Sequence, residues 1–271
     1  MTVLDATVGL GGHAEVILRE IGSWGRLVAM DRDPEALEQA KARLERFTDQ
    51  VIWMRGHFGE LEPLLREAGM GKLDAALFDL GVSSWQLDQG RRGFSFSREG
   101  PLDMRMNPEE EMTAAELCNR ASLQDLERIL RVYGEERWAG RIARAIVRAR
   151  PLQSTAALAE VIRRAVPPGR RGKIDPATRT FQALRIAVNR ELELLPLGLE
   201  QAIQRLKPSG RIAVLAYHSL EDRIVKQMFR EKARAEILHL IIPKPVRPGP
   251  EEVARNPRSR SACLRAAEVV G

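Results

Sequence analysis

Short apolar runs alternate with amphipathic segments in the N-terminal part of the chain, and this alternation restricts the fold more than any other feature. The predicted strands cover residues 3–6, 26–30, 51–54 and 75–78. Predicted helices over 13–20 and 34–47 follow the first two strands, and their apolar residues recur at helical spacing. This order is typical of a parallel sheet whose strands are joined by crossover helices, so we expect an α/β fold.

The spacing of apolar residues becomes helical from residue 112 to residue 190, where no convincing strand pattern is present. Strand-like sequence returns at 212–216, and the apolar runs 237–242 and 262–270 are expected to form a closing antiparallel pair. The sequence therefore predicts a sheet that is interrupted by an all-helical insert between its fourth and fifth strands. The expected boundaries are 1–108 for the first part of the sheet domain, 109–186 for the insert and 187–271 for the second part.

Residues 81–108 contain several Gly, Ser and Pro residues and are expected to form a long loop. A structureless loop of this length is uncommon inside a compact domain, and where it occurs it usually has a function. We therefore expect this loop to contribute to a binding or catalytic site.

The composition is that of a folded globular chain, with 44% hydrophobic and 30% charged residues. The longest apolar run, 237–242, is far shorter than the roughly 20 residues that a membrane-spanning helix needs. The N-terminus has no basic segment of the kind that begins a signal peptide. Cys118 and Cys263 form neither a metal-ligand spacing nor a disulfide framework. We expect a cytoplasmic protein with no membrane segment and no metal site.

Basic residues are concentrated in one segment of the chain, residues 137–179. That segment has eleven basic residues and two acidic ones, a charge of +9 in a chain whose net charge is +6, so the remainder sums to −3. A basic block in an otherwise slightly acidic protein indicates an anionic partner, and nucleic acid is the first candidate. The alternative is a charged face that is only solvated.

Four arginines of this segment are spaced so that they fall on one face of a predicted helix over 138–149, opposite Trp138 and Ile142. They are Arg137, Arg141, Arg144 and Arg148. Like charges at this spacing repel one another, and an anionic backbone would turn the repulsion into binding. Pairing with acids of a neighbouring helix is the alternative. If the arginines of this helix do not bind RNA, the basic residues at 170–173 are the next candidate surface.

A glycine-rich turn that contains Gly9 and Gly11 joins the first predicted strand to the first predicted helix. Glycines allow a ligand to approach the backbone, and the start of the helix offers unpaired N–H groups. Asp31 ends the second strand, where a carboxylate can accept hydrogen bonds from both hydroxyls of a ribose. The pattern predicts a cofactor that contains a nucleoside, with a plain tight turn as the alternative.

Asp5 helps to distinguish two classes of cofactor, because it lies beside the glycines. A carboxylate there can face the ammonium group of S-adenosylmethionine, whereas it would repel the pyrophosphate of a nicotinamide cofactor. A turn cap is the alternative role for Asp5.

Several longer motifs occur in one order along almost the whole chain, and they carry a resemblance to a known family. They are Gly11-Gly12-His13, Asp79-Leu-Gly-Val-Ser-Ser-Trp-Gln86-Leu-Asp88, Arg92-Gly-Phe-Ser-Phe-Ser, Gly100-Pro-Leu-Asp-Met-Arg-Met106, Pro176-Ala-Thr-Arg-Thr-Phe-Gln-Ala-Leu-Arg-Ile186, His218-Ser-Leu-Glu-Asp-Arg223 and Asn256-Pro-Arg-Ser-Arg-Ser261. With these motifs the chain resembles the ribosomal small subunit methyltransferase H family, which methylates the exocyclic N4 of a cytidine in 16S ribosomal RNA.

The resemblance implies a Rossmann-like class I methyltransferase fold, S-adenosyl-L-methionine as cofactor, and 16S ribosomal RNA or the small ribosomal subunit as partner. It also implies the cofactor contacts, which fall on Gly11, Gly12, His13, Asp31, Phe58, Asp79 and Gln86. Taken from position alone, His13 can equally be a surface residue, Phe58 can equally be a core residue, and Gln86 is expected to be an exposed loop residue.

Asp79 is the best candidate for a role in the reaction. It ends the fourth predicted strand, at the edge where open α/β sheets bind ligands. There it can accept a hydrogen bond from the amino group of the target base, or it can orient the cofactor. His218, after the fifth strand, is either near the target or a residue that starts a helix.

The chain departs from the family pattern at three places. Members of the family normally carry a segment with the pattern His-x-Pro-Val-Leu before the first strand, and we expect any contribution of that segment to be absent here. Trp85 stands where the family usually has proline, so the shape of that loop is open. Ser209 replaces the more usual glycine before Gly210.

Two other functional classes compete with a methyltransferase. One is an RNA-binding assembly factor that keeps an inactive cofactor fold, and the intact set of Gly11, Gly12, Asp31 and Asp79 argues against such decay. The other is a nicotinamide oxidoreductase, and this function does not explain the basic helical insert.

Overall fold

The computed structural model describes residues 1–167 and 175–271 and divides the chain into two compact units. The first unit, which we call the sheet unit, consists of Met1–Gly81 and Leu192–Gly271. The second, the helical unit, consists of Val82–Glu191. In the part of the chain that the structure describes, no helix has the length and apolar composition needed to span a bilayer.

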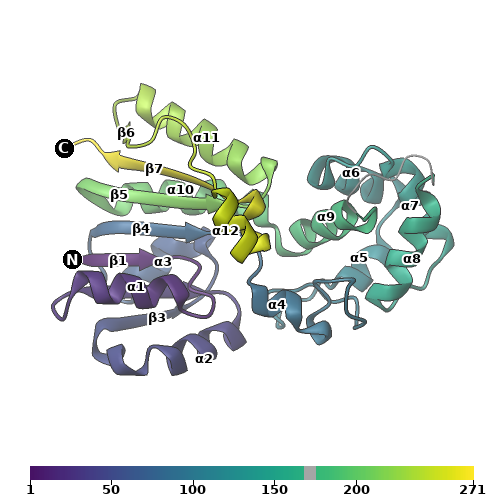
Figure 1. The fold of residues 1–271 in the computed structure, drawn as a ribbon, viewed down its shortest axis with the longest axis horizontal. Helices are drawn as coiled ribbons and strands as arrows, with labels where there is room; N and C mark the ends of the chain where they lie inside the picture. The colour runs from purple at the N-terminus through teal and green to yellow at the C-terminus, as the bar shows by residue number, and fades with distance from the viewer. Residues whose placement is uncertain (168–174) are drawn as a thin grey trace. The chain divides into compact units, whose positions relative to one another are not determined.

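The sheet unit contains one seven-stranded sheet with the strand order β3-β2-β1-β4-β5-β7-β6 (Figure 1). The strands are β1 (Thr2–Asp5), β2 (Arg26–Asp31), β3 (Val51–Arg55), β4 (Leu73–Asp79), β5 (Leu206–Ala216), β6 (Leu238–Leu240) and β7 (Cys263–Val269). Strands β1 to β5 are parallel, while β7 is antiparallel to both β5 and β6. The order of the first five strands is that of nucleotide-binding doubly wound sheets, and the predicted Rossmann-like fold is confirmed.

Helices cover both faces of this sheet because alternate residues of each strand point to opposite sides. Val3 and Leu27 pack in a cluster with α1 (Gly12–Ile21) and α2 (Pro34–Arg43). Their neighbours in sequence, such as Leu4, lie in a second cluster on the other face. The helices of that face are α3 (Leu61–Glu67), α10 (Glu191–Arg205) and α11 (Ser219–Arg234). Burial on both faces explains why the parallel strands are almost continuously hydrophobic.

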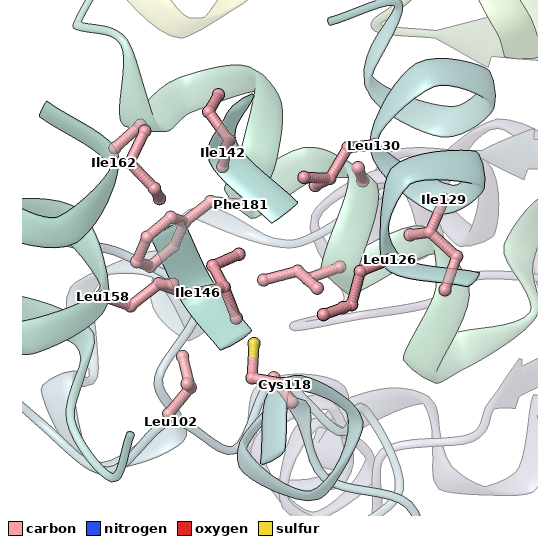
Figure 2. Close-up of a cluster of buried hydrophobic side chains, with 14 of the residues drawn as sticks. Leu102, Cys118, Leu126, Ile129, Leu130, Ile142, Ile146, Leu158, Ile162 and Phe181 are labelled. Carbon is pink, nitrogen blue, oxygen red and sulfur yellow. The ribbon is translucent and has the colours of Figure 1, made fainter. Parts of the chain in front are cut away.

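The helical unit is built around one apolar cluster, part of which Figure 2 shows. Its helices are α4 (Ser84–Asp88), α5 (Ala114–Arg120), α6 (Leu123–Gly134), α7 (Ala139–Arg148), α8 (Thr155–Ala165) and α9 (Ala177–Asn189). Leu126, Ile142 and Phe181 come from three different helices and all lie in this cluster. The cluster is separate from the two clusters of the sheet unit, so the insert has a core of its own.

The helical unit is longer than the sequence analysis expected, since it begins at Val82 rather than at 109 and ends at Glu191 rather than at 186. The segment predicted as a loop contributes Leu102 and Met104 to the core of this unit. Asn189 ties the same segment to the end of α9, because its side chain accepts from the backbone of Met106 at 2.8 Å and donates to Met104 at 2.8 Å. The apolar residues of the segment 81–108 have no regular spacing, so their burial could not be predicted from periodicity in the sequence.

Smaller differences concern the ends of elements. The predicted helix over 34–47 is α2 followed by the 3₁₀ segment η1 (Glu45–Gln50), and β5 begins earlier than expected. Ser209 lies within β5 with a φ of 62°, a left-handed conformation that favours glycine, which explains why glycine is common there in the family. The remaining short segments are η2 (Phe58–Glu60), η3 (Gly90–Arg92), α12 (Pro250–Arg255) and η5 (Pro257–Ser261).

Candidate functional site

Three neighbouring strands of the sheet unit, β2, β1 and β4, all end in an aspartate at the same edge of the sheet. Asp5 lies in register with Ala29 of β2 and with Leu77 of β4. Asp31 and Asp79 therefore each lie two residues beyond the level of Asp5, one on either side of it. This is the edge at which open α/β sheets bind their ligands.

The glycine-rich turn after β1 reaches over this edge. Gly9 and Gly11 have φ values of 50° and 78°, a region that residues with a side chain rarely adopt. Gly11 precedes α1, and a side chain there would press against Leu44. The first turn of α1 starts at Gly12, directly after this turn, and the first N–H groups of a helix have no partner within the helix.

Asp31 is held by the turn that it faces. Its Oδ2 accepts a hydrogen bond from the backbone of Gly9 at 2.8 Å, and its Oδ1 accepts one from Asp33 at 2.9 Å. Burial raises the pKa of Asp31 to about 6, although these hydrogen bonds oppose the shift. A carboxylate has about four lone-pair sites, so Asp31 keeps acceptor capacity for a ligand beside its backbone donors.

Asp5 is the most enclosed of the three acids, with 1% of its surface exposed. Its Oδ1 accepts from the backbone of Thr7 at 3.2 Å, and its Oδ2 has no hydrogen-bond partner in the described part of the chain. Burial raises the pKa of Asp5 to about 7. An unsatisfied buried carboxyl oxygen is costly, and a cation or a donor from a ligand would satisfy it.

Asp79 connects three segments of the sheet unit. Its Oδ2 lies 3.2 Å from His13 Nε2 at the start of α1, and its Oδ1 accepts a hydrogen bond from the hydroxyl of Tyr217 at 2.9 Å. Its backbone N–H donates to Oγ1 of Thr7 at 2.7 Å. The hydrogen bond to Asp79 raises the pKa of His13, because it favours the charged imidazole.

Tyr217 was not singled out by the sequence analysis, which considered the next residue, His218. His218 is the N-cap of α11, where its Nδ1 accepts from the backbone of Glu221 at 3.4 Å. The contact that the structure shows for His218 is therefore that of a residue that starts a helix. The signal for Tyr217 was its position directly after the fifth strand, which pairs with the strand that ends in Asp79.

Phe58 lies in η2, shortly after the third strand, and is partly exposed. Its ring meets the edge of Phe78 with 5.8 Å between ring centroids, and it lies against the backbone of α10 at Gly198. The segment is joined to the acidic edge, because the N–H of Gly56 donates to the carbonyl of Asp31 at 3.0 Å. Phe58 thus has a packing role, and its exposed part stays available to a ligand.

Gln86 differs from the expectation of an exposed loop residue. It is buried in the first turn of α4 in the helical unit, where its Oε1 accepts from the backbone of Ser83 at 2.9 Å. The side chain of Ser83 accepts in return from the backbone of Gln86, so the pair forms a capping box. The pattern Ser-x-x-Gln was the signal for this role.

Of the predicted site residues, Gly11, Gly12, His13, Asp31 and Asp79 gather at one edge of the sheet unit, and Phe58 is linked to that edge.

Comparison with known proteins identifies close relatives of the whole chain. The model of a family described as the MraW methylase family matches residues 1–270. The chain is 50% identical to a ribosomal RNA small subunit methyltransferase H of Pelobacter propionicus, over 98% of this chain and 91% of that protein. It is 49% identical to the protein of the same name from Trichlorobacter lovleyi, over 100% of this chain and 92% of that protein. The corresponding protein of Acidobacterium capsulatum is 48% identical, over 98% and 91%.

The raised pKa of Asp5 makes a prediction about stability. Between about pH 4 and pH 7 the unfolded chain releases the proton of Asp5 while the folded chain keeps it, so this group lowers the free energy of unfolding as the pH rises. We expect Asp5→Asn to become more stable relative to the unchanged protein by about 2–4 kcal/mol between pH 4 and pH 8. Urea unfolding at a series of pH values measures the difference.

The matched control is Asp49→Asn, which removes an exposed carboxyl group. Its stability should follow that of the unchanged protein at every pH. A constant difference between Asp5→Asn and the unchanged protein across this range would show that Asp5 ionises normally in the fold.

Proposed function

The chain belongs to the MraW methylase family and is a methyltransferase that uses S-adenosylmethionine, and we propose that it methylates the exocyclic N4 of a cytidine in 16S ribosomal RNA. The observation that carries the proposal is the match over the full chain to proteins named for small-subunit ribosomal RNA, combined with an intact acidic edge. Neither a nicotinamide oxidoreductase nor an inactive assembly factor accounts for both. The proposed place of action is the cytoplasm.

The residues of the acidic edge fit the groups that S-adenosylmethionine presents. The uncompensated Oδ2 of Asp5 suits the ammonium of the methionine part. The carboxylate of Asp31 would accept from the ribose hydroxyls, and Phe58 would lie beside the adenine. We assign further contacts to Gly11, Gly12, His13 and Asp79, which lie in the same unit. When bound, the cofactor supplies a methyl group on a sulfonium, which is open to in-line displacement.

Asp79 is our candidate for the residue that assists the transfer. The amino group of cytosine is a poor nucleophile, because its lone pair is delocalised into the ring. A carboxylate that accepts a hydrogen bond from N4–H stabilises the positive charge that develops on the nitrogen as its bond to the methyl group forms. The base must be held outside any stack for this contact, and most of the remaining requirement is positioning.

The helical unit is our candidate for the RNA-binding part of the molecule. The only acids of the basic segment 137–179, Glu160 and Asp175, pair with Arg164 and Arg163 at 2.7 Å and 2.9 Å. In the same unit Arg150 donates to backbone carbonyls of Cys118 and Ala121. Among the residues of the segment that the structure describes, the arginines of α7 have no such contact within the unit.

The face of α7 that carries Arg141, Arg144 and Arg148, which we call the arginine face, is exposed. Among the residues that the structure describes, no acidic side chain pairs with these three. The opposite side of α7 is fully buried through residues such as Ile142 and Ile146, so the helix cannot turn its charges away. Arg137 precedes the helix, and its guanidinium lies 5.1 Å from the ring centre of Trp138. The basic group at 170–173 falls outside the described residues.

The direct test of the function is the product. Small subunits or their RNA, from cells that lack the enzyme, should gain N4-methylated cytidine when incubated with the protein and S-adenosylmethionine, while free cytidine should not react. The reason is that binding of the RNA backbone provides the energy that positions the base. Mass analysis of the nucleosides identifies the product. Methyl groups on protein, on DNA or on carbon-5 of cytosine would contradict the proposal.

Asp31→Ala should weaken the binding of S-adenosylmethionine by about 10- to 100-fold, since it removes a charged acceptor of the ribose hydroxyls. Isothermal titration calorimetry measures the affinity. Asp31→Asn keeps an acceptor for the Gly9 backbone, and it separates the loss of ribose contacts from loosening of the turn. A folded Asp31→Ala protein with unchanged affinity would remove Asp31 from the cofactor site.

The arginine face predicts the salt dependence of RNA binding. The logarithm of the affinity should fall linearly with the logarithm of the salt concentration, and the slope should flatten by up to about 0.7–0.9 for each contacting arginine removed. We therefore expect Arg141→Gln combined with Arg144→Gln to flatten the slope while cofactor binding stays unchanged.

Arg230→Gln combined with Arg234→Gln is the matched control, because it removes two exposed arginines from α11 of the sheet unit. This control has the same change in net charge and should keep the slope. If the α7 double variant also keeps the slope, the RNA surface lies elsewhere, and the group at 170–173 is tested next.

A further inference from the structure

We propose that Tyr217 is a positioning residue for the methyl transfer, and that it acts by holding the carboxylate of Asp79 in the orientation in which it accepts from the target amino group. The inference rests on the proposed function for the role of Asp79. It extends that function to a residue that lies outside the set of cofactor contacts assigned above.

The backbone of Tyr217 is fixed close to Asp79 by the sheet. Asp79 lies in register with Leu215 of the neighbouring strand, and the N–H of Leu80 donates to the carbonyl of Leu215 at 3.0 Å. The N–H of Tyr217 donates to Oε2 of Glu221 at 2.9 Å, and Glu221 is buried in the first turn of α11. The start of the tyrosine side chain is therefore anchored by both a strand and a helix.

The phenol can only act as a donor in this contact. A carboxylate has no proton to offer, so the hydroxyl of Tyr217 donates to Oδ1 of Asp79 at 2.9 Å. Burial and the charge of Asp79 both raise the pKa of Tyr217 far above its usual value. The hydroxyl consequently keeps its proton at every pH at which the enzyme works, which makes it a permanent support rather than an exchanging acid.

A second donor holds the other oxygen of the same carboxylate. His13 Nε2 lies 3.2 Å from Oδ2, and His13 belongs to the start of α1, far from Tyr217 in the sequence. Two supports on opposite oxygens restrict rotation of the carboxylate, while each oxygen keeps room for one further donor. The side chain of Asp79 is 25% exposed, so a substrate group can still reach it. An acceptor that is oriented before the substrate arrives avoids the cost of reorganisation during the reaction.

The test replaces Tyr217 by phenylalanine, which removes the hydroxyl and keeps the ring. We expect kcat for 16S ribosomal RNA methylation to fall by about tenfold or more, with the affinity for S-adenosylhomocysteine and the unfolding temperature unchanged. Tyr133→Phe is the matched control, because Tyr133 is the only other tyrosine of the chain and lies in α6 of the helical unit. It should keep the kcat of the unchanged protein.

A double-mutant cycle separates action through Asp79 from a general structural role. In an Asp79→Ala background, measured in single turnovers, Tyr217→Phe should lower the rate no further, because the group on which it acts is gone. A full additional loss in that background would overturn the proposal, and so would an unchanged kcat of Tyr217→Phe itself.

A measurement that does not depend on activity completes the test. Without the donor on Oδ1, the negative charge of Asp79 is less compensated and favours the charged imidazole of His13 more strongly. The pKa of His13 should therefore rise further in Tyr217→Phe. Proton NMR of the histidine ring, assigned with His13→Gln among the four histidines, follows this pKa. An unchanged value would overturn the role of Tyr217. If the unchanged protein forms no N4-methylated cytidine at all, the proposed function fails, whereas this titration still reports on Tyr217.

Discussion

The site of this protein depends on the gathering of three carboxyl groups at one edge of a parallel sheet. Asp31, Asp5 and Asp79 end three adjacent strands, so without compensation their charges would oppose the fold that brings them together. The compensation comes from the backbone of the glycine-rich turn and from His13 and Tyr217, and burial raises the pKa of Asp5 to about 7. The turn, the first helix and the segment after β5 thus each contribute a group that contacts one of these carboxyl groups.

Much of this arrangement follows from the sequence, because the sheet order is implied by the alternation of strands and helices. Once that order is assumed, Asp31 and Asp79 fall at the same edge as the glycine-rich turn, as the structure has them. The contact of Tyr217 with Asp79 was not predicted, because no motif around Tyr217 points to Asp79. The pairing of β4 with β5 brings the two residues together. The burial of Gln86 and its capping role were not predicted, because the Ser-x-x-Gln pattern lies in a stretch without regular apolar spacing.

The helical unit illustrates a different limit of sequence reasoning. The amphipathic pattern of α7 gave the buried and exposed sides correctly, since helical spacing alone determines them. The compact unit begins at Val82 rather than at 109, and Asn189, more than eighty residues later in the chain, accepts a hydrogen bond from the backbone of Met106 and donates one to the carbonyl of Met104. The spacing of apolar residues predicts which face of a helix is buried. It does not predict which irregular segment packs against that face.

The interruption of the sheet has a consequence for how the protein is made. Strand β4 pairs with β5, and the whole helical unit lies between these two strands in the chain. A ribosome releases residues in order, so the helical unit, with its own core, can fold while β4 is paired with β1 but still lacks β5. A folded insert also shortens the flexible loop that must close when β5 finally docks. The hydrogen bond between Tyr217 and Asp79 can form only after that docking, so a nascent chain acquires its complete acidic edge among the last events of its synthesis.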